Sequence, residues 1–458
     1  MPEEAQTGLF GMLPEQVSAA RPVGAPRLRK AERRQVSLRP VSLEDPLPAD
    51  HRARFVWAFA ERLDLSALYG AIKAVEGHPG HPPADPRVLL ALWLHATVEG
   101  VGGAREPDRL RREHIGFEWL CGGVGMNHTT LADFRVAHGA VLERLSVDSF
   151  AAMLKTGHAS LERVAQDGMR VRAAAGAASF RRPASLERYR AEAAAEVARL
   201  RAELEADPGG LSRRQAAARQ RAAAEREQRV AAALAVAEQL AAEQPDDRRA
   251  QDEDPPGPQG GAAGQRAAKP PPEPRVSTTD AEARVMKMPD GGFRPAFNLG
   301  FASDPRSTMI AAVTLDNSGS DKGQLWPMSE RLAEAYGQRP GEHLADGGFA
   351  KLADIEALAA AGVVVFAPVP KPRDAGRDRH LPRDGDGLGV AAWRRRMGSE
   401  AAKAIYKERA ATAECVNAQC RNRGLLRFCV RGLKKAKAVG LWHALAHNMV
   451  CTARLLAA

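Results

Sequence analysis

The chain has 458 residues, of which 44% are hydrophobic, and it carries a formal net charge of +10 at pH 7. Its length corresponds to roughly three average domains, and its apolar content excludes a wholly disordered chain. No segment approaches the roughly 18 consecutive apolar residues of a membrane helix, and the five cysteines include no Cys-x2-Cys pair. A cytoplasmic protein with reduced cysteines is therefore expected, and its basic charge suits a partner that carries phosphates.

The N-terminal third divides into two regions of different composition. Residues 1–45 contain Pro and Arg without sustained periodicity, which predicts a flexible arm. Apolar residues then recur at helical spacing, and we expect an all-helical domain over residues 46–155. Near its end, residues 127–135 combine possible cap residues with an amphipathic pattern. Two interpretations of that helix stay open: it enters a DNA groove, or it closes the helical bundle.

A long Ala/Arg/Glu-rich segment in the middle of the chain is an insertion in the predicted core. Apolar residues from Leu186 to Leu204 recur at three- and four-residue steps, and Ser212 and Gln215 have capping-box spacing. This pattern predicts a helical hairpin over residues 184–244. A dimer-forming coiled coil, a basic arm on DNA and a solvated hairpin with one apolar stripe are all compatible, and we favour the last. The Pro/Gly/Gln-rich residues 245–275 are expected to form a disordered linker.

The remaining segments have the composition of a mixed α/β core. A short aliphatic strand ends at Asp167 before a glycine, and strand-like composition continues over residues 169–173. Further strands are expected at 284–288, 297–302, 309–315, 343–345 and 363–367, and helices at 323–336, 351–361 and 399–422. This order predicts a mixed sheet flanked by helices over residues 156–183 and 276–458. It is the order found in ribonuclease H-like nuclease cores.

Three carboxylates lie in this core in an order that suits a two-metal site. Asp167 follows one strand, Asp346 follows another just before a glycine pair, and Glu414 lies on the last of the three helices. Attack on a phosphodiester builds charge on the attacking and leaving oxygens, which two divalent ions roughly 3.5 to 4 Å apart stabilise. Because Mg²⁺ and Mn²⁺ prefer hard oxygen ligands, these three residues are candidate metal ligands and catalytic residues.

The identity of the first aspartate has competitors. An isolated Asp-Gly pair is far more often a turn than a ligand, so the interpretation depends on all three carboxylates together. Asp280, Asp316 and Asp321 also lie near predicted strand ends and are able to supply a ligand or a supporting contact. Of these, Asp280 is the reserve candidate.

On these residues the chain resembles bacterial insertion-sequence transposases of the DDE type, over most of residues 50–450. In that family the glutamate helix bears a tyrosine, an arginine, the glutamate and, about two turns on, a Lys or Arg, and Tyr406, Arg409, Glu414 and Arg421 stand at those places. Residues 277–284, 346–349, 395–397 and 444–448 also match. Two departures are Phe349, where a tyrosine is common, and Arg421, where a lysine is common.

The resemblance implies roles for individual residues. Asp167, Asp346 and Glu414 would bind two Mg²⁺ or Mn²⁺ ions, and Tyr406, Arg409 and Arg421 would contact DNA near the scissile bond. The finer likeness is to the insertion sequence 1182-like members of the insertion sequence 4/5-type group.

The resemblance also implies an activity and partners. We expect cleavage at insertion-sequence ends followed by transfer of the 3′-OH into target DNA, with the helical N-terminal domain recognising the terminal inverted repeats. A homodimer or larger assembly is expected when two ends are paired, in the bacterial cytoplasm at the nucleoid. One alternative is a transposase-derived DNA-binding protein that has lost its activity, although the intact triad argues against it. A basic coiled-coil scaffold is a more distant alternative.

Overall fold

The computed structural model describes residue 40 and residues 42–75, 77, 81–206, 212–243, 273–372 and 376–457. The expected arm over 1–45 and the expected linker over 245–275 lie almost entirely outside these residues. Residues Leu43–Ala458 form one compact unit, separate from Met1–Ser42. Within the described part of the chain, no helix is both long enough and apolar enough to cross a membrane.

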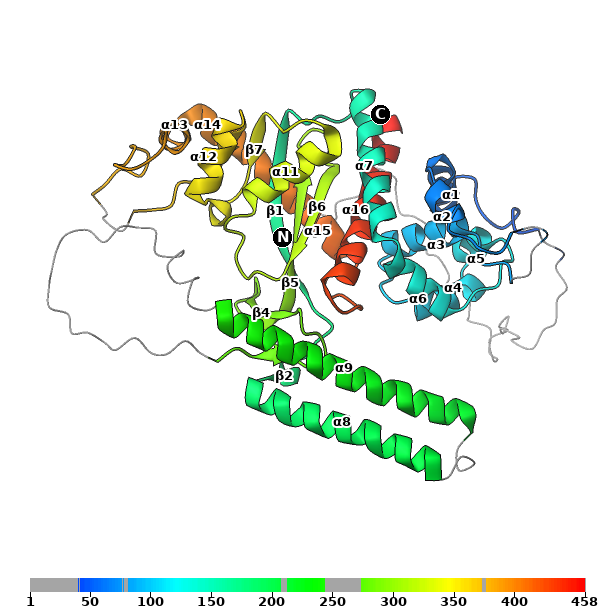
Figure 1. The fold of residues 1–458 in the computed structure, drawn as a ribbon. Helices are drawn as coiled ribbons and strands as arrows, with labels where there is room; N and C mark the ends of the chain where they lie inside the picture. The colour runs from blue at the N-terminus through cyan, green and yellow to red at the C-terminus, as the bar shows by residue number, and fades with distance from the viewer. Residues whose placement is uncertain are drawn as a thin grey trace, which may run out of the picture. The chain divides into compact units, whose positions relative to one another are not determined.

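A six-stranded mixed sheet forms the centre of the unit (Figure 1). Its strands are β1 (Arg163–Arg172), β4 (Arg284–Lys287), β5 (Phe293–Ser303), β6 (Ile310–Asp316), β7 (Glu342–Leu344) and β8 (Val364–Phe366). The order is β4-β5-β1-β7-β8, and β6 also pairs with β5. β1 is antiparallel to β5 and parallel to β7, which in turn is parallel to β8. The predicted mixed sheet is confirmed.

The strand that carries Asp167 is longer than expected. Its pairing with β5 runs without interruption from Ala165 to Arg172, through Gly168, which lies opposite Gly300. Because Gly168 is accommodated inside the ladder, the prediction that the strand ends at Asp167 is wrong. Asp167 lies in the middle of β1, opposite Phe301.

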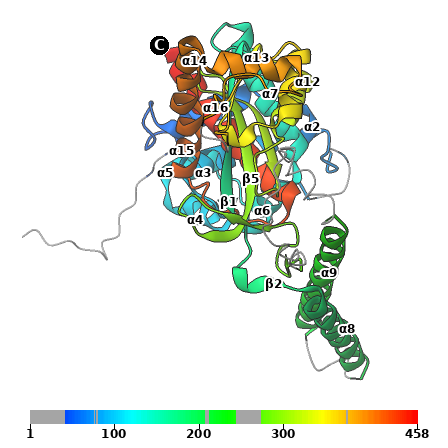
Figure 2. The same cartoon turned by 90° about the vertical axis from the view of Figure 1, so that its left-hand side faces the viewer.

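Helices cover both faces of the sheet, as expected (Figures 1 and 2). Those that follow the sheet strands are α11 (Leu325–Tyr336), α12 (Leu352–Ala360), α13 (Leu388–Met397), α14 (Glu400–Arg409), α15 (Cys415–Asn422) and α16 (Leu433–Ala457). α16 packs closely on β5 and β6 through Gly440, where an added Cβ would lie only 2.8 Å from Leu299. Around β7 and β8, Trp393 of α13 is fully buried and donates its indole N–H to Ala367 O at 3.0 Å.

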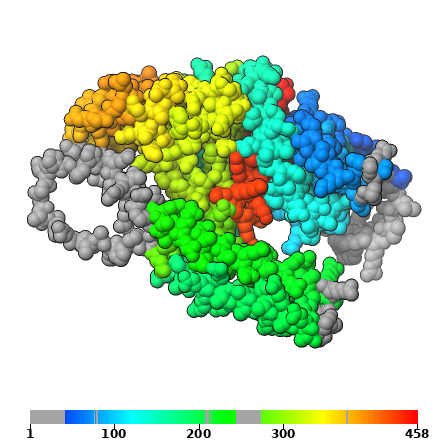
Figure 3. Space-filling view, viewed as in Figure 1, coloured from blue at the N-terminus to red at the C-terminus, as the bar shows by residue number. Residues whose placement is uncertain are grey.

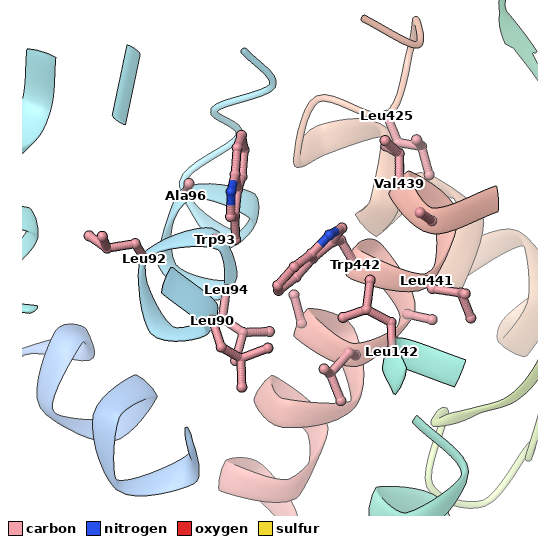
Figure 4. Packing of buried hydrophobic residues seen from close by; sticks show 14 of the residues in the cluster. Leu90, Leu92, Trp93, Leu94, Ala96, Leu142, Leu425, Val439, Leu441 and Trp442 are labelled. Carbon is pink, nitrogen blue, oxygen red and sulfur yellow. The ribbon is translucent and has the colours of Figure 1, made fainter. Parts of the chain in front are cut away.

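The N-terminal helices share a hydrophobic core with the sheet. They are α1 (Arg52–Arg62), α2 (Ser66–Tyr69), α3 (Pro86–Val98), α4 (Arg105–Glu113), α5 (Ile115–Cys121), α6 (His128–Ala137) and α7 (Gly139–Lys155). One apolar cluster joins them to α16 and to β1, β5 and β6. At its centre the rings of Trp93 and Trp442 lie 6.4 Å apart, and both are fully buried (Figure 4). Replacing either Trp with Ala would cost about 3 to 5 kcal/mol.

The structure favours the bundle-closing interpretation of α6. Its N-cap is Asn127, whose side chain accepts the backbone N–H groups of Thr129 and Thr130. Leu131 and Arg135 of this helix are buried, and each accepts an indole N–H at its carbonyl, Leu131 from Trp93 and Arg135 from Trp442. These contacts tie α6 into the core.

The predicted helical hairpin is present. It consists of α8 (Pro183–Ala206) and α9 (Arg213–Glu243), inserted between the short paired strands β2 (Phe180–Arg181) and β3 (Val276–Ser277), with the 3₁₀ turn η1 (Ala177–Ser179) before β2. Ser212 and Gln215 form the expected capping box, each backbone N–H bonding the other's side chain at 3.3 Å. Leu186, Ala193 and Leu200 are the buried residues of α8, at heptad spacing. Most of the hairpin surface is exposed (Figure 3), which favours a solvated hairpin with one apolar stripe.

Side chains from two helices form hydrogen bonds with backbone groups of β6, which has β5 as its strand partner in the described sheet. Asn448 of α16 accepts the N–H of Ile310 and donates to its C=O, both at 2.8 Å. The Tyr336 hydroxyl donates to Ala311 O at 2.7 Å. Because an uncovered edge strand invites pairing with other chains, these contacts protect the sheet. Asn448 belongs to the C-terminal segment on which the family resemblance partly rests.

Candidate active site

Asp167 lies on the sheet face that α14, α15 and α16 cover. Its Oδ1 atom accepts hydrogen bonds from Arg409 Nη2 at 3.1 Å and from the backbone N–H of Gly168 at 3.0 Å. The other carboxylate oxygen accepts Asn417 Nδ2 at 2.9 Å. Burial raises the pKa of Asp167; Arg409 opposes that shift, and the charge of Asp346 adds to it. The hydrogen bonds from Arg409, Gly168 and Asn417 hold the Asp167 side chain in one orientation.

The strand register explains why Asp346 lies near Asp167. β1 and β7 are parallel, with Ala165 beside Leu344, and each aspartate follows two residues later. Residues at matching positions of parallel neighbours lie side by side, so Asp346, just after the end of β7, lies near Asp167 in the middle of β1. The carboxylate of Asp346 caps the 3₁₀ turn η2 (Gly347–Phe349) by accepting Gly348 N–H at 2.7 Å. Its other oxygen, Oδ2, lies 3.8 Å from Arg409 Nη2, and 40% of the side chain is exposed.

Glu414 lies on the predicted helix over residues 399–422. The helix begins after Ser399, whose hydroxyl caps Ala402 N–H at 3.2 Å, and it ends at Asn422. Figure 2 shows α14 and α15 following one another beside the sheet. Between them is a π-helical turn, η3 (Ala410–Glu414), which the sequence analysis did not predict.

This π turn aligns Arg409 with Glu414. In an α-helix, residues five positions apart point roughly 140° away from each other. A π turn bonds residues i and i+5 and brings them to one side, and such turns are frequent at functional sites. Here Arg409 Nη1 donates to Glu414 Oε1 at 3.3 Å. In the sequence, the five-residue spacing between Arg409 and Glu414 was the one sign of this turn, because helix propensity does not distinguish a π turn from an α-helix.

Arg409 connects all three predicted catalytic residues. Besides its bonds to Asp167 and Glu414, its Nη2 atom lies 3.8 Å from Asp346 Oδ2. The Arg409 side chain is only 9% exposed. Burial alone would lower the pKa of Arg409, but the surrounding anionic groups raise it, so the guanidinium stays charged. The structure thus gathers Asp167, Asp346 and Glu414 around one cation.

The two other predicted DNA-binding residues have different surroundings. Tyr406 is half-buried beside Arg409; burial raises the pKa of its hydroxyl, with Arg409 opposing the shift and Asp346 adding to it. Arg421 lies in the last turn of α15 and makes no hydrogen bond or ion pair with any of the three carboxylates. It is a partly exposed cation on the same helix as Glu414. Tyr406 therefore borders the carboxylate cluster, whereas Arg421 lies outside it.

Asn417 is a site residue that the sequence analysis missed. It is 2% exposed, and its amide nitrogen is bonded to Asp167. Its Oδ1 atom is buried and has no hydrogen-bond partner in the described structure. Asn417 follows Glu414 by three residues and so shares its helix face. An asparagine on a helix is too common for this position to have been singled out.

The reserve candidate Asp280 makes its contacts elsewhere. It is buried and accepts Gly432 N–H at 3.0 Å, while Glu282 accepts Leu433 N–H at 2.9 Å. Both carboxylates thus cap the start of α16. Burial is the main cause of the raised pKa of Asp280.

The other two candidate aspartates, Asp316 and Asp321, lie on the opposite side of the sheet from the carboxylate cluster. An added Cβ at Gly168 would lie 2.5 Å from Asp321 Oδ1, so Asp321 lies on the side toward which residue 168 faces. Successive strand residues face opposite ways, and Asp167 therefore faces away from it. Asp316 interacts with Asp321, and burial raises the pKa of Asp316 to about 6. Neither rival joins the cluster around Arg409.

We expect Asp280→Ala to destabilise the fold without preventing cleavage of DNA. The change removes the acceptor for Gly432 N–H and should lower the free energy of unfolding by about 1 to 2 kcal/mol. Urea unfolding measures this, and Asp280→Asn, which keeps an acceptor, serves as the matched control. If the folded Ala variant lost all cleavage activity, Asp280 would return as a candidate ligand.

The donor set fits a divalent cation. Among the described residues, no three His, Cys, Asp or Glu side chains form a ready-made metal-binding group. The guanidinium of Arg409 lies between the three carboxylates instead. These carboxylates and the unpartnered amide oxygen of Asn417 are nevertheless hard oxygen donors of the kind that Mg²⁺ and Mn²⁺ prefer. Since the position already attracts a guanidinium, its electrostatics favour a cation. Asp167, Asp346 and Glu414 are the residues that would hold one.

Two family models match the chain. Residues 268–449 match the transposase DDE domain, a range that includes Asp346 and Glu414 but begins after Asp167. Residues 41–137 match the transposase domain (DUF772), which covers α1 to α6. No curated protein and no solved structure matches the chain.

Proposed function

Since two transposase domains in one chain indicate a DNA transposase of the insertion-sequence DDE type, we propose that this protein cuts and joins DNA with divalent metal ions. It would cleave at the ends of its insertion sequence and transfer the freed 3′-OH into target DNA. The finer placement in the insertion sequence 1182-like group is part of this proposal, as is action at the bacterial nucleoid.

The observation that carries the proposal is the convergence of Asp167, Asp346 and Glu414 on one guanidinium. These residues come from β1, the end of β7 and a helix, which are far apart in sequence. The sheet order β6-β5-β1-β7-β8 supports a ribonuclease H-like classification, because three antiparallel strands precede two parallel ones. DDE transposases generally use divalent metal ions, in agreement with this oxygen-rich site.

The residues of the chain have distinct tasks in this chemistry. Divalent ions held by the carboxylates would stabilise the charge that develops on the attacking and leaving oxygens. Asn417 and the Gly168 N–H fix the orientation of Asp167, and the Gly348 N–H fixes that of Asp346. Tyr406, Arg409 and Arg421 would contact the DNA beside the scissile bond. One site would serve both steps, with water as the nucleophile in cleavage and the 3′-OH in transfer.

Cations without ion-pair partners follow the Glu414 helix. Within the part of the chain that the structure describes, Arg421, Arg427, Lys434 and Lys435 form no ion pair, and the last three are exposed. By contrast, Lys437 pairs with Glu143 at 3.0 Å. Unpaired cations are free to bind phosphates, which positions DNA without reading its sequence. We propose that these four residues hold the strand that enters the site.

Arg427→Gln is expected to weaken DNA binding on any sequence. Loss of one phosphate contact should reduce the slope of log K against log salt concentration by about 0.9 for duplex DNA. Fluorescence anisotropy between low and moderate salt measures the slope. Lys437→Gln is the matched control, because Lys437 is already paired, and its slope should equal that of the unmodified protein. Equal slopes for all three proteins would remove Arg427 from the DNA path.

The proposal assigns end recognition to the N-terminal helices. The helices α1 to α6 coincide with the second transposase match. Because their core is continuous with the sheet, DNA bound there would be held in a defined position relative to the carboxylates. Pairing two ends would require at least a dimer.

The test is cleavage of short duplexes that carry the DNA flanking this gene. Reactions with Mg²⁺ or Mn²⁺ are compared with EDTA, and Glu414→Gln serves as the inactive control. Metal-dependent nicking at the repeat boundary that disappears in the variant supports the proposal. Binding without nicking under every metal would support the alternative, a transposase-derived DNA-binding protein without activity.

A further inference from the structure

Arg409 has two roles that conflict in this structure. The proposed function needs it beside a DNA phosphate, yet the side chain is only 9% exposed. Both of its terminal nitrogens are directed to carboxylates: Nη1 to Glu414, and Nη2 to Asp167 and Asp346. In this arrangement each terminal nitrogen already faces a carboxylate, whose negative charge would repel an approaching phosphate.

We propose that Arg409 is the internal counter-ion of the metal-free site, and that it leaves the space among the three carboxylates when a divalent cation binds there. The inference rests on the proposed function, because it concerns the same carboxylates. It adds an order of events: metal first, then the contact of Arg409 with DNA.

The two cations exclude each other on physical grounds. A Mg²⁺ ligand oxygen lies about 2.0 to 2.1 Å from the ion. The Asp167 oxygen that would approach the ion so closely already accepts Arg409 Nη2 at 3.1 Å. A guanidinium retained beside a divalent ion would also face strong repulsion in a poorly solvated site. Three carboxylates and one guanidinium leave an excess negative charge, so exchange for a divalent ion is electrostatically favourable.

The surroundings of Arg409 permit this movement. Its Nε atom has no hydrogen-bond partner in the described structure, so exchange breaks the contacts of Arg409 with the carboxylates and with the Tyr406 hydroxyl but none at Nε. The side chains of Glu414 and Asp346 are 61% and 40% exposed, which leaves the cluster open to solvent on their side. Asn417 stays bonded to Asp167 and keeps that carboxylate oriented after Arg409 has left.

A consequence is cooperative binding of metal and DNA. If metal frees Arg409 for a phosphate, each ligand strengthens the binding of the other by the same factor. Without metal, the carboxylates hold the guanidinium and also repel the DNA backbone. The protein would thus engage the scissile phosphate only when its site is loaded.

Arginine labelling of the unmodified protein tests the movement directly. Phenylglyoxal modification is followed by peptide mass spectrometry with and without Mn²⁺, in the absence of DNA, while electron paramagnetic resonance measures bound Mn²⁺. We expect Arg409 to react at least several-fold faster with Mn²⁺. Arg394, whose side chain is 3% exposed and paired with Asp386, should stay unreactive, and Arg421 should react equally in both conditions.

Bound Mn²⁺ with unchanged or slower labelling of Arg409 overturns the inference alone. Absence of bound Mn²⁺ overturns both it and the proposed metal site.

A variant supplies the second readout. Arg409→Gln removes the competing charge, so Mn²⁺ should bind about fivefold or more tightly without DNA. Arg421→Gln makes the same change of net charge on the same helix and should keep the original affinity, as should Arg409→Lys, which retains a cation. Weaker or unchanged binding by folded Arg409→Gln contradicts the exchange. If that variant does not fold, the labelling experiment decides.

Discussion

Asp346→Asn is expected to reduce cleavage at the DNA ends by more than about a hundredfold while DNA binding changes little. The change removes the charge of one of the three carboxylates around Arg409. It keeps the side-chain oxygen that caps Gly348 N–H, and Asn caps about as well as Asp. Stability should therefore be nearly unchanged, and the loss can be attributed to chemistry.

Parallel assays of nicking and of binding, the latter in Ca²⁺ to prevent turnover, measure the two effects separately. Asp384→Asn is the matched control, because Asp384 is an exposed aspartate with no hydrogen bond or ion pair to the other described residues. Equal loss of binding and cleavage in Asp346→Asn, or retained cleavage, would contradict the assignment of Asp346 as a metal ligand.

The fold is expected to lose several kcal/mol of stability between pH 7 and pH 5. His95, His343, His443 and His447 are each at most 5% exposed. Burial lowers the pKa of His443 to about 3 and those of the other three to about 4. These values lie below the ordinary value of about 6.5, so below that pH the unfolded chain binds more protons than the folded one. Stability is present above about pH 6.5 and is lost progressively toward pH 4.

Each histidine should contribute about 2 kcal/mol to this loss at pH 5, which is large against a total stability of about 5 to 15 kcal/mol. Chemical unfolding at several pH values measures it. His95→Leu should remove the contribution of one histidine to this loss of stability, because neither ring nitrogen of His95 has a hydrogen-bond partner in the described structure. Leu92→Ala, which changes a buried residue without a titratable group on the helix of His95, should lower stability without altering its pH dependence. A stability that did not vary over this range would show that the histidines are solvated.

The elements that carry the site were predictable because their signals are local. Alternating and apolar runs indicated β1, β7 and β8, and the absence of Pro and Gly after Ser399 indicated the Glu414 helix. The capping box of α9 could be predicted from Ser212 and Gln215 alone. The residues proposed as catalytic were named from their order along the chain and from the local structure expected around each of them.

The arrangement between elements could not be predicted in the same way. The π turn depends on how α14 and α15 pack, and the contact of Asn417 with Asp167 joins residues that are distant in sequence. Asp280 was a candidate ligand because it lies near a predicted strand end, but its carboxylate accepts a backbone N–H just before α16. Likewise, no local pattern shows that Trp93 meets Trp442 and joins the N-terminal helices to the sheet. Such contacts depend on register and packing, which a single sequence does not specify.

The hairpin also bears on how the chain reaches its folded state. β1 must pair with β5 across the long segment between Arg172 and Phe293, and closing so long a loop is entropically unfavourable. Leu186 of α8, residues of α9 and Val276 of β3 form one apolar cluster at the base of the hairpin, where β2 pairs with β3. Once this base has formed, the loop that remains is short, which lowers the closure penalty by roughly 1.5 kcal/mol. The base thus separates the insertion from closure of the sheet that it interrupts, and lengthening the two helices equally should leave the refolding rate nearly unchanged.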